Sequence, residues 1–568
     1  MTKIITMIQR ILFKIFILIL ILFGALQSYA QLDTIKFAKP LNIDLLLTGN
    51  FAEPRGAHFH SGLDFRTYGE GKALMSIAEG YVSRINISPW GYGKAVYIKH
   101  PNGYTSVYGH ISRFEEPLAS YVERLQYQIE SFSVDTILPE NLLQITKGQI
   151  FAYSGNTGHS AGPHLHFELR ESNTEKPVNT LNSVYKIKDN ISPTILSIVV
   201  YASETELKRI VADKRIVGTP PKYNAGIISV NIANNEQISF GLEYVDRMNN
   251  THNKFGVKQL KMWVNDTLYY HSCIEKIDFA KQAQKNSFFD YYYYLNFSRN
   301  IHRCFIEPNN DLEHYMSIQN RGWVNVKSDT KYDVKIEVID YNDNSSIVEF
   351  ELFVEKNEHE KTNGFLRWDT DNFLLTENAR LEINTGSFFD NETLQFFKSG
   401  EAKFSGKYTV EPYNIALKSG VEISIAINEV AEKYYDKLFI ACERKGRVHY
   451  LKAKHSYDYL TAYAKVLGTY YVAADTTPPK LTSINLSNGS NMSGISEIKL
   501  KMTDDLSGIA NFNGYINDKW VLFSYEPKNQ IASYRFDEFF PEGGSYKLKF
   551  IAEDDCGNMS VLERNFTR

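Results

Sequence analysis

The chain has 568 residues, enough for about three to five domains of ordinary size. Its 43% hydrophobic and 23% charged residues are typical of packed globular domains and exclude general disorder. The 62 basic and 66 acidic residues give a formal net charge of -4, so no basic excess indicates nucleic-acid binding. Tyr and Phe, at 37 and 35 residues, favour half-buried strands and predict a β-rich protein.

Residues 1–30 have the pattern of a secretory signal peptide. Three basic residues precede an apolar run of 12 residues, Ile15–Leu26, and Ser28 and Ala30 then supply a small-x-small cleavage site. The run is too short for a good membrane span, and an uncleaved anchor is the alternative. Cleavage after Ala30 would remove three positive charges, which changes the net charge from -4 to -7. We therefore expect an exported protein, periplasmic or extracellular, without a membrane span after signal removal.

Short runs rich in Val, Ile, Tyr and Phe follow, and glycine-containing turns separate them. They are Gly80–Ile87, Lys94–His100, Tyr104–His110 and His164–Leu169. Short strands joined by tight turns predict an antiparallel sheet or a barrel-like core. The exception is Pro117–Glu130, which predicts a short helix within an insertion at about 115–146.

Two later segments share one pattern. The first begins at Asp189 and the second at Asp475, and each enters a β-like run after a proline. Each also carries acidic turns, which are DRMNN (246–250) and DYNDNSS (340–346) in the first segment, and DDLSGI (504–509) and DDCGNMS (554–560) in the second. This pattern suits an immunoglobulin-like sandwich. The aromatic run Phe288–Phe297 is predicted as a buried strand, with a sugar-stacking surface as the alternative.

These patterns predict five segments. They are a signal peptide (1–30), an N-terminal β domain (31–187), an immunoglobulin-like sandwich (188–356), a further β-sandwich (357–474) and a second immunoglobulin-like sandwich (475–568). Four cysteines are too few for a disulfide scaffold. Export would allow Cys273 and Cys304 to pair, with free thiols as the alternative.

Five candidate site residues lie in the N-terminal domain. His60 and Asp64 form H-x-x-x-D, and positions i and i+4 share one face of a strand. His164 and His166 form H-x-H, which also places both imidazoles on one face, and His110 ends the run VYGH. Imidazole and carboxylate groups are zinc ligands, and a catalytic zinc site uses three protein ligands plus water. Three of these five groups would bind one Zn²⁺, and two would remain for proton transfer.

The segments that carry these residues resemble the lysostaphin-type, or LytM-like, zinc metallopeptidases, which cut peptides in bacterial cell walls. The matching stretches are HFHSGLDF (58–65), GYGKAVYIKHPNGYTSVYGHIS (91–112) and KGQIFAYSGNTGHSAGPHLHFELR (147–170). The resemblance covers about residues 45–182. It implies a mainly β chain, with a LytM-like antiparallel domain of the duplicated hybrid motif type.

The resemblance also implies residue roles. By the family pattern, His60, Asp64 and His166 bind the zinc ion, and His110 and His164 assist catalysis. The implied function is an exported zinc metalloendopeptidase that hydrolyses peptide cross-links of peptidoglycan. The alternatives are a catalytically silent LytM-like protein that binds wall or activates another hydrolase, and a surface protein whose β-sandwiches are its main part. All five site residues are present, which favours the enzyme.

Several neighbouring features leave alternatives open. Arg55 could hold a substrate carboxylate or be a surface residue, and His58 could contact substrate or be structural. His100 and His159 lie outside the ligand pattern and are expected to be exposed. The insertion at 115–146 could cover the substrate groove or be a surface elaboration. The C-terminal β domains could bind a glycan or a protein partner.

Overall fold

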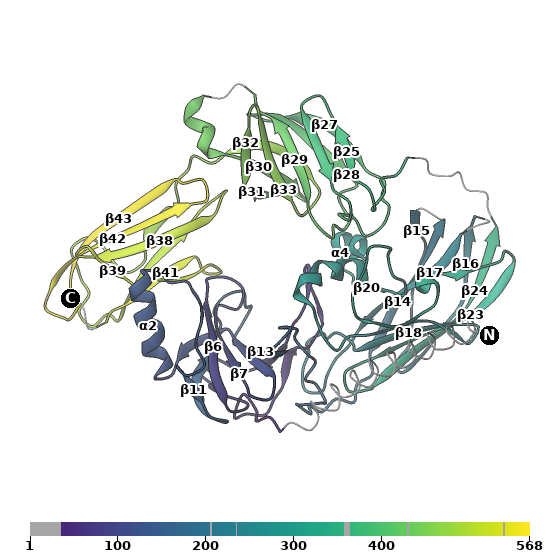
Figure 1. Ribbon diagram of the computed structural model, residues 1–568, viewed down its shortest axis with the longest axis horizontal. Coiled ribbons are helices and arrows are strands. Elements are labelled where there is room, and N and C mark those ends of the chain that lie inside the picture. Colours follow the sequence, from purple (N-terminus) through teal and green to yellow (C-terminus); the bar gives the residue numbers. More distant parts are fainter. Residues whose placement is uncertain (1–35, 205–206, 234–235, 357–363, 429–430, 538–539) are drawn as a thin grey trace, which may run out of the picture.

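The computed structural model describes residues 36–568, apart from 205–206, 234–235, 357–363, 429–430 and 538–539. The predicted signal peptide, residues 1–30, lies outside this range. The described chain is mainly β, as expected, and its β-rich units follow one another around a ring (Figure 1). Among the described residues, none of the helices combines the length and the apolar character that crossing a membrane requires.

The N-terminal domain (residues 36–187) contains one large sheet and two small ones. The large sheet has the order β1 (Leu47–Gly49), β4 (Leu63–Arg66), β13 (His164–Glu171), β8 (Tyr104–Gly109), β7 (Lys94–Lys99), β6 (Gly80–Ile87) and β10 (Val134–Ile137), with β11 (Gln144–Ile145) also on β6. The small sheets are β5 (Ala73–Met75), β12 (Ile150–Ser154) and β9 (Ile111–Phe114), and the pair β2 (Pro54–Arg55) and β3 (His58–Phe59). All pairs are antiparallel, as predicted.

Alternation along β13 separates the core from the site. Leu165, Phe167 and Leu169 are at most 1% exposed and belong to the domain's main hydrophobic cluster. His164 and His166 point to the opposite face, because side chains alternate along a strand. The same hydrophobic cluster continues into the next unit through Phe255 and other residues. The N-terminal domain therefore shares its core with the sandwich that follows it.

The predicted helix in the insertion is confirmed as α2 (Leu118–Ile129). Its buried face includes Leu118 and Val122, while Tyr127 reaches the last sandwich of the chain. There Tyr127 donates a hydrogen bond to Asp537 Oδ2 at 2.5 Å and stacks edge-on against Trp520. The insertion therefore joins the N-terminal domain to the last sandwich of the chain (Figure 1).

The first sandwich (residues 194–356) packs two sheets around one hydrophobic cluster. One sheet contains β15 (Leu207–Arg215), β14 (Thr194–Glu204), β17 (Gln237–Val245) and β20 (Ile301–Arg303), with β22 (Val324–Asn325) on β17. The other contains β16 (Lys222–Ile232), β24 (Ser345–Lys356), β23 (Thr330–Ile339), β18 (Gln259–Val264), β19 (Thr267–Cys273) and β21 (Tyr315–Ile318). Short helices η1 (Phe279–Gln284), α3 (Lys285–Phe288), α4 (Tyr291–Phe297) and η2 (Asn320–Gly322) lie between strands.

The predicted strand at Phe288–Phe297 is wrong, because these residues end α3 and form α4. Asp290 caps α4 by accepting hydrogen bonds from the backbone N–H groups of Tyr292 and Tyr293. A side-chain oxygen at this position satisfies the first free N–H groups and starts a helix even in an aromatic run. The possible Cys273–Cys304 disulfide is also absent, since all four cysteines, which lie in the described residues, are free thiols.

The second sandwich (residues 372–474) also has two sheets around a shared core. Its sheets are β25 (Asn372–Leu375), β26 (Ala379–Ile383), β29 (Val421–Ala426), β33 (Tyr459–Ala464) and β32 (Ala453–Ser456), and β27 (Gln395–Glu401), β28 (Gly406–Glu411), β34 (Thr469–Ala474), β30 (Leu438–Arg444) and β31 (Arg447–Leu451). The helix η3 (Glu432–Lys437) precedes β30.

The third sandwich (residues 480–567) repeats the strand order of the first. One sheet contains β35 (Lys480–Ser483), β37 (Glu497–Thr503), β41 (Ile531–Arg535) and β40 (Ser524–Glu526), and the other β36 (Ser490–Asn491), β43 (Met559–Thr567), β42 (Ser545–Asp554), β38 (Ile509–Ile516) and β39 (Lys519–Val521). In both units an early edge strand pairs in parallel with the last strand. The sequence repeat is thus a structural repeat, while the immunoglobulin-like assignment and the exact domain boundaries stay predictions.

Candidate functional site

Strand register gathers the five predicted site residues from three separate segments. On β13, His166 lies opposite Asp64 of β4 on one side and opposite Gly109 of β8 on the other. His110 follows Gly109 directly, and its backbone turns into the left-handed region with φ of 58°. This turn ends the strand and leaves the His110 ring beside His164, with ring centroids 4.6 Å apart.

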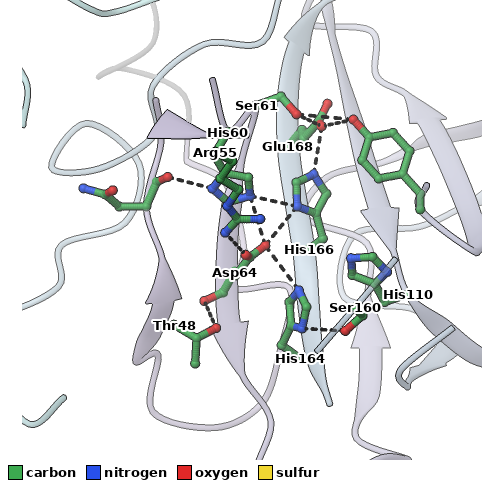
Figure 2. A network of polar contacts seen from close by, with 12 residues as sticks. Thr48, Arg55, His60, Ser61, Asp64, His110, Ser160, His164, His166 and Glu168 are labelled. Atoms are coloured by element: carbon green, nitrogen blue, oxygen red, sulfur yellow. Dashed lines mark hydrogen bonds and ion pairs between the residues drawn. The ribbon is translucent and has the colours of Figure 1, made fainter. Parts of the chain in front are cut away.

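Three of these side chains converge on one point, as Figure 2 shows. His60 Nε2 lies 3.1 Å from His166 Nδ1 and 3.1 Å from Asp64 Oδ1, and His166 Nδ1 lies 2.9 Å from the same Asp64 oxygen. All three residues are at least 97% buried. Two imidazole nitrogens and a carboxylate oxygen are the donor set of a three-residue zinc site.

Hydrogen bonds on the far sides of the rings fix which nitrogen is free. His60 Nδ1 lies 2.7 Å from the carbonyl oxygen of Asn50, and a carbonyl only accepts, so Nδ1 donates and Nε2 keeps its lone pair. His166 Nε2 lies 2.8 Å from Glu168 Oε1 and likewise donates, which leaves Nδ1 free. Two lone pairs therefore face each other across 3.1 Å. Only a cation or a proton between them relieves the repulsion, so the residues fit a bound zinc ion.

Local electrostatics favour positive charge at this point. Burial lowers the pKa of His166, but its hydrogen bonds to Asp64 and Glu168 outweigh burial and raise that pKa to about 9. Burial raises the pKa of Asp64, yet His60 and the other histidines hold it well below its usual value. The second oxygen of Asp64 pairs with the guanidinium of Arg55. The carboxylate is therefore ionised, with Oδ1 directed at the two imidazoles.

Glu168 supports His166 from a fully buried position. Its Oε1 accepts hydrogen bonds from Ser61 Oγ at 2.5 Å and from the Tyr92 hydroxyl at 2.5 Å, besides the one from His166. Its Oε2 accepts from Arg170 Nε at 2.6 Å. Burial raises the pKa of Glu168, but Arg170 and His166 lower it far below the ordinary value. Glu168 thus stays ionised and orients the His166 ring.

His110 and His164 line the open side of this cluster. His110 Nδ1 donates to the carbonyl of Thr157 at 2.8 Å, and His164 Nδ1 donates to the carbonyl of Gly162 at 2.8 Å. Each ring therefore presents Nε2 as a free acceptor. His164 Nε2 is buried, has no hydrogen-bond partner and lies 3.4 Å from Asp64 Oδ1. Burial, with His166 and His164 nearby, lowers the pKa of His110 to about 3, so its ring is neutral at neutral pH.

Gly93 allows Thr157, the hydrogen-bond partner of His110, to lie directly against the backbone at position 93. A Cβ atom on Gly93 would lie 2.3 Å from Thr157 Oγ1 and 2.6 Å from Thr157 O, and its φ of 66° is in the left-handed region. Thr157 is the residue whose carbonyl accepts from His110. The motifs GYGK and GNTG thus meet in space and set the position of His110.

An open pocket of about 1440 Å³ adjoins the cluster, and the N-terminal domain and the third sandwich supply most of its lining, with Asn253 from the first sandwich. His110, His164 and Asp64 lie on the side of the N-terminal domain, and Tyr525 and Lys528 lie on the side of the third sandwich. Lys528 Nζ donates to backbone carbonyls of the N-terminal domain at residues 156 and 160. None of residues 115–146, all of them described, lines this pocket. The third sandwich therefore forms the wall of the pocket that the insertion could have formed, and Tyr127 of α2 contacts this sandwich.

The remaining sequence candidates have mixed outcomes. Arg55 lines the pocket, but its guanidinium pairs with Glu53 and Asp64. His58 is exposed on β3, and His159 is exposed at the pocket rim, as expected. The expected exposure of His100 is wrong. It is 2% exposed, because its two ring nitrogens bond the Glu79 carbonyl and Ser106 Oγ, both at 2.8 Å.

The sequence analysis did not identify all the residues that hold the candidate zinc ligands in place. Glu168 lies two residues after His166, so strand alternation places it on the same face, and this signal was available. Tyr92 carried no comparable signal, because its partner Glu168 lies 76 residues further along the chain. Arg170 and Asn50 lie only two and ten residues from their partners Glu168 and His60, and the sequence analysis did not assign them this role.

Comparisons with known proteins match two parts of the chain to family models. Residues 58–127 match the family model described as peptidase family M23, and residues 363–475 match that of a Zu5-like domain. The N-terminal domain is therefore a peptidase family M23 domain, which confirms the resemblance seen in the motifs.

Individual relatives match the same region. The DD-carboxypeptidase/endopeptidase Mpg of Neisseria meningitidis is 28% identical over 123 residues, which cover 22% of each chain. The peptidoglycan DD-endopeptidase ShyA of Vibrio cholerae is 28% identical over 151 residues, 25% of this chain and 29% of that one. The catalytic domain of the M23 protein EnpA from Enterococcus faecalis is 25% identical and covers 25% of this chain and 94% of that one, with a TM-score of 0.19. The chain thus spans less than a third of the length of these two curated relatives.

Proposed function

We propose that this protein is an exported zinc metalloendopeptidase that hydrolyses peptide cross-links of bacterial peptidoglycan. The observation that carries the proposal is the convergence of His60 Nε2, Asp64 Oδ1 and His166 Nδ1, with the free Nε2 atoms of two further histidines beside them. The M23 family match and the endopeptidases among the relatives support the reaction class. The predicted signal peptide supports export, to the periplasm or beyond the cell.

One zinc ion would be held by His60, Asp64 and His166. When bound there, zinc supplies a Lewis acid that lowers the pKa of water to about 7. Asn50 and Glu168 accept hydrogen bonds from the far ring nitrogens of His60 and His166 and so direct the other nitrogens to the metal position, while Arg55 pairs with the far oxygen of Asp64. Zinc would displace the proton that His166 holds without metal.

Proton transfer falls to His110 and His164. The low pKa of His110 keeps its imidazole neutral, which is the form that accepts a proton at Nε2. A zinc ion in place of the His166 proton would also place positive charge near His110. His164 Nε2 lies 3.4 Å from Asp64 Oδ1. We assign His110 as proton acceptor and His164 as hydrogen-bond donor to the developing oxyanion.

The test combines metal content with product analysis. Purified full chain should contain one zinc ion and release cross-link cleavage products from isolated peptidoglycan, identified by mass spectrometry. His166→Ala should lose both zinc and activity. His110→Ala should keep zinc and lose turnover by at least 100-fold, because general-base catalysis contributes about 10²–10⁴.

A matched control is His455→Ala, which removes an exposed histidine of the second sandwich and should change neither property. Full activity in His110→Ala would overturn the assigned role of that residue. A zinc-loaded wild type that releases no product would favour the catalytically silent alternative.

A further inference from the structure

Three carboxylates gather where the first sandwich meets the N-terminal domain. Asp189 precedes β14, Asp246 follows β17, and Asp340 follows β23. One oxygen from each lies within 4.8 Å of the others. These are the acidic turns of the sequence repeat, and the proposed peptidase reaction gives them no role.

This cluster is buried and lacks a compensating charge. Asp246 is 2% exposed and Asp340 is 1% exposed. Asp246 Oδ1 is buried without any hydrogen-bond partner. Within the described part of the chain, none of the three carboxylates forms an ion pair with a basic side chain. An unpaired buried carboxylate is costly, so three together require a cation or a proton.

The third sandwich shows how the same arrangement is satisfied by protein groups. Its counterparts are Asp475, Asp504 and Asp554, which occupy the equivalent strand ends. Asp475 Oδ2 accepts hydrogen bonds from Ser507, through its backbone N–H at 3.0 Å and its hydroxyl at 2.7 Å. Asp504, the counterpart of Asp246, accepts at Oδ2 from the backbone N–H groups of Leu506 and Gly508, at 3.2 and 2.7 Å, whereas Asp246 Oδ1 has no partner. The unpartnered oxygen therefore distinguishes the first cluster from its repeat.

Turn geometry holds the carboxylate of Asp340 in place. Its Oδ1 accepts from the backbone N–H groups of Asn342 and Asn344, at 2.7 and 2.9 Å, and its Oδ2 accepts from Asn344 Nδ2 at 2.8 Å. Asp189 Oδ1 accepts from the backbone N–H of Ile191 at 3.1 Å. These bonds use some lone pairs and leave others on each carboxylate, since an ionised carboxylate has about four acceptor sites.

We propose that Asp189, Asp246 and Asp340 bind a calcium ion. The donors are all hard carboxylate oxygens, and no imidazole or thiol joins them, which favours Ca²⁺ over zinc. Calcium accepts flexible coordination by six to eight oxygens, so water completes the shell. Calcium sites of extracellular modules have Kd values of about 10⁻⁴–10⁻³ M, which suits an exported protein.

The pKa values of the cluster also reflect its burial and its close negative charges. Burial, with Asp340 and Asp189 nearby, raises the pKa of Asp246 to about 9, and burial raises that of Asp340 to about 6. Without a cation, the cluster would hold a proton at neutral pH. The experiment must therefore separate calcium binding from proton retention.

The location connects this site with the candidate metal centre. Asp246 opens a loop that returns to itself at Phe255, whose backbone N–H donates to the Asp246 carbonyl at 3.1 Å. The next residue, Gly256, exchanges two hydrogen bonds with the Asn50 side chain, both at 2.9 Å. The Asn50 carbonyl accepts from His60 Nδ1. A calcium ion at Asp246 would brace the base of the loop that positions Asn50.

The test titrates CaCl₂ into the full chain, loaded with one equivalent of zinc, in calcium-depleted buffer. Calorimetry should give submillimolar calcium binding to the wild type and weaker binding of Mg²⁺. Asp246→Asn, which keeps the side-chain shape, should weaken that calcium binding at least tenfold. Asp504→Asn is the matched control in the third sandwich and should keep it. Calcium at about 100 times its Kd should shift the folding equilibrium of the wild type about 100-fold.

The unfolding temperatures of the wild type and Asp246→Asn should have opposite orders with and without calcium. Without calcium, Asp246→Asn should unfold at a higher temperature than the wild type, because asparagine is neutral without the proton that Asp246 has to take up on folding. With calcium the order should reverse, and hydrogen exchange in residues 247–256 of the wild type should slow.

Three results would overturn the proposal: a wild type that binds no calcium and is stabilised only by lower pH, an Asp246→Asn variant that binds calcium like the wild type, or loss of binding in Asp504→Asn alone. The measurements do not use peptidase activity, so failure here and failure of the proposed function are distinguishable.

Discussion

Replacing Glu168 with glutamine should weaken both zinc binding and the fold. The carboxylate is fully buried and holds Arg170, whose side chain is 7% exposed. Glutamine keeps the shape but leaves the guanidinium with only the exposed carboxylate of Glu175, at 3.5 Å, as an anionic partner. Breaking a buried ion pair from one side costs about 3–5 kcal/mol, and little solvent is present to screen it.

The effect on the metal arises through His166. A glutamine can turn its amide nitrogen toward His166 Nε2 and remove the acceptor that fixes the ring. Loss of such a supporting partner lowers metal affinity by about 10–100-fold. Competition with a chelator of known affinity measures this change, and urea unfolding of the full chain measures the change in stability.

Glu175 provides a matched control, because it bonds the same arginine at 3.5 Å from a position 54% exposed. Glu175→Gln should cost less than about 1 kcal/mol and leave zinc affinity unchanged. Equal effects of Glu168→Gln and Glu175→Gln on zinc affinity and on stability would refute the positioning role of Glu168. They would mean that the burial of Glu168 does not matter.

Three further predictions concern other parts of the molecule. Gly93→Ala should displace Thr157 and lower kcat by about 10–100-fold, with zinc retained. Gly148→Ala should not lower kcat, because Gly148 has a similar φ but open space where the Cβ atom would lie. Equal kinetics of the two variants would contradict the argument that the contact of Gly93 with Thr157 matters. Burial lowers the pKa of Lys285 to about 8 from 10.5. The unfolded chain therefore binds more protons between these values, and stability should rise by about 3 kcal/mol as pH increases across them. Lys285→Met should abolish that rise in stability, measured by urea titrations. A rise that persists in the variant would have to come from another titratable group. Tyr127→Ala should speed hydrogen exchange at the contact between α2 and the third sandwich, and unchanged exchange would mean that other contacts hold the sandwich there.

Local patterns predicted the strands of the N-terminal domain closely. The expected run Gly80–Ile87 matches β6 at both ends, and H-x-H falls on β13 as expected. Alternation and turn residues are properties of neighbouring positions, so they can be read without the fold. The helix α4 shows the limit, because one capping aspartate outweighed the strand preference of an aromatic run.

Long-range contacts decide the features that the sequence did not reveal. His100 is buried because Glu79 and Ser106 lie beside it only in the folded sheet. Lys528 meets backbone atoms more than 360 residues earlier in the chain. The histidines of the candidate site were identifiable by spacing, but the second wall of their pocket depends on how four units close into a ring.

That ring has a consequence for a substrate without free ends. Peptidoglycan is a cross-linked net, so a cross-link cannot be threaded end-first into a channel that is covalently closed. Within the described part of the chain, contacts such as that of Tyr127 with Asp537 join the pocket's two main walls, while the covalent connection runs the long way round through the other sandwiches. If peptidoglycan is the substrate, as we propose, a strand of the net would enter sideways where those contacts separate, and the covalent connection would keep the two walls together.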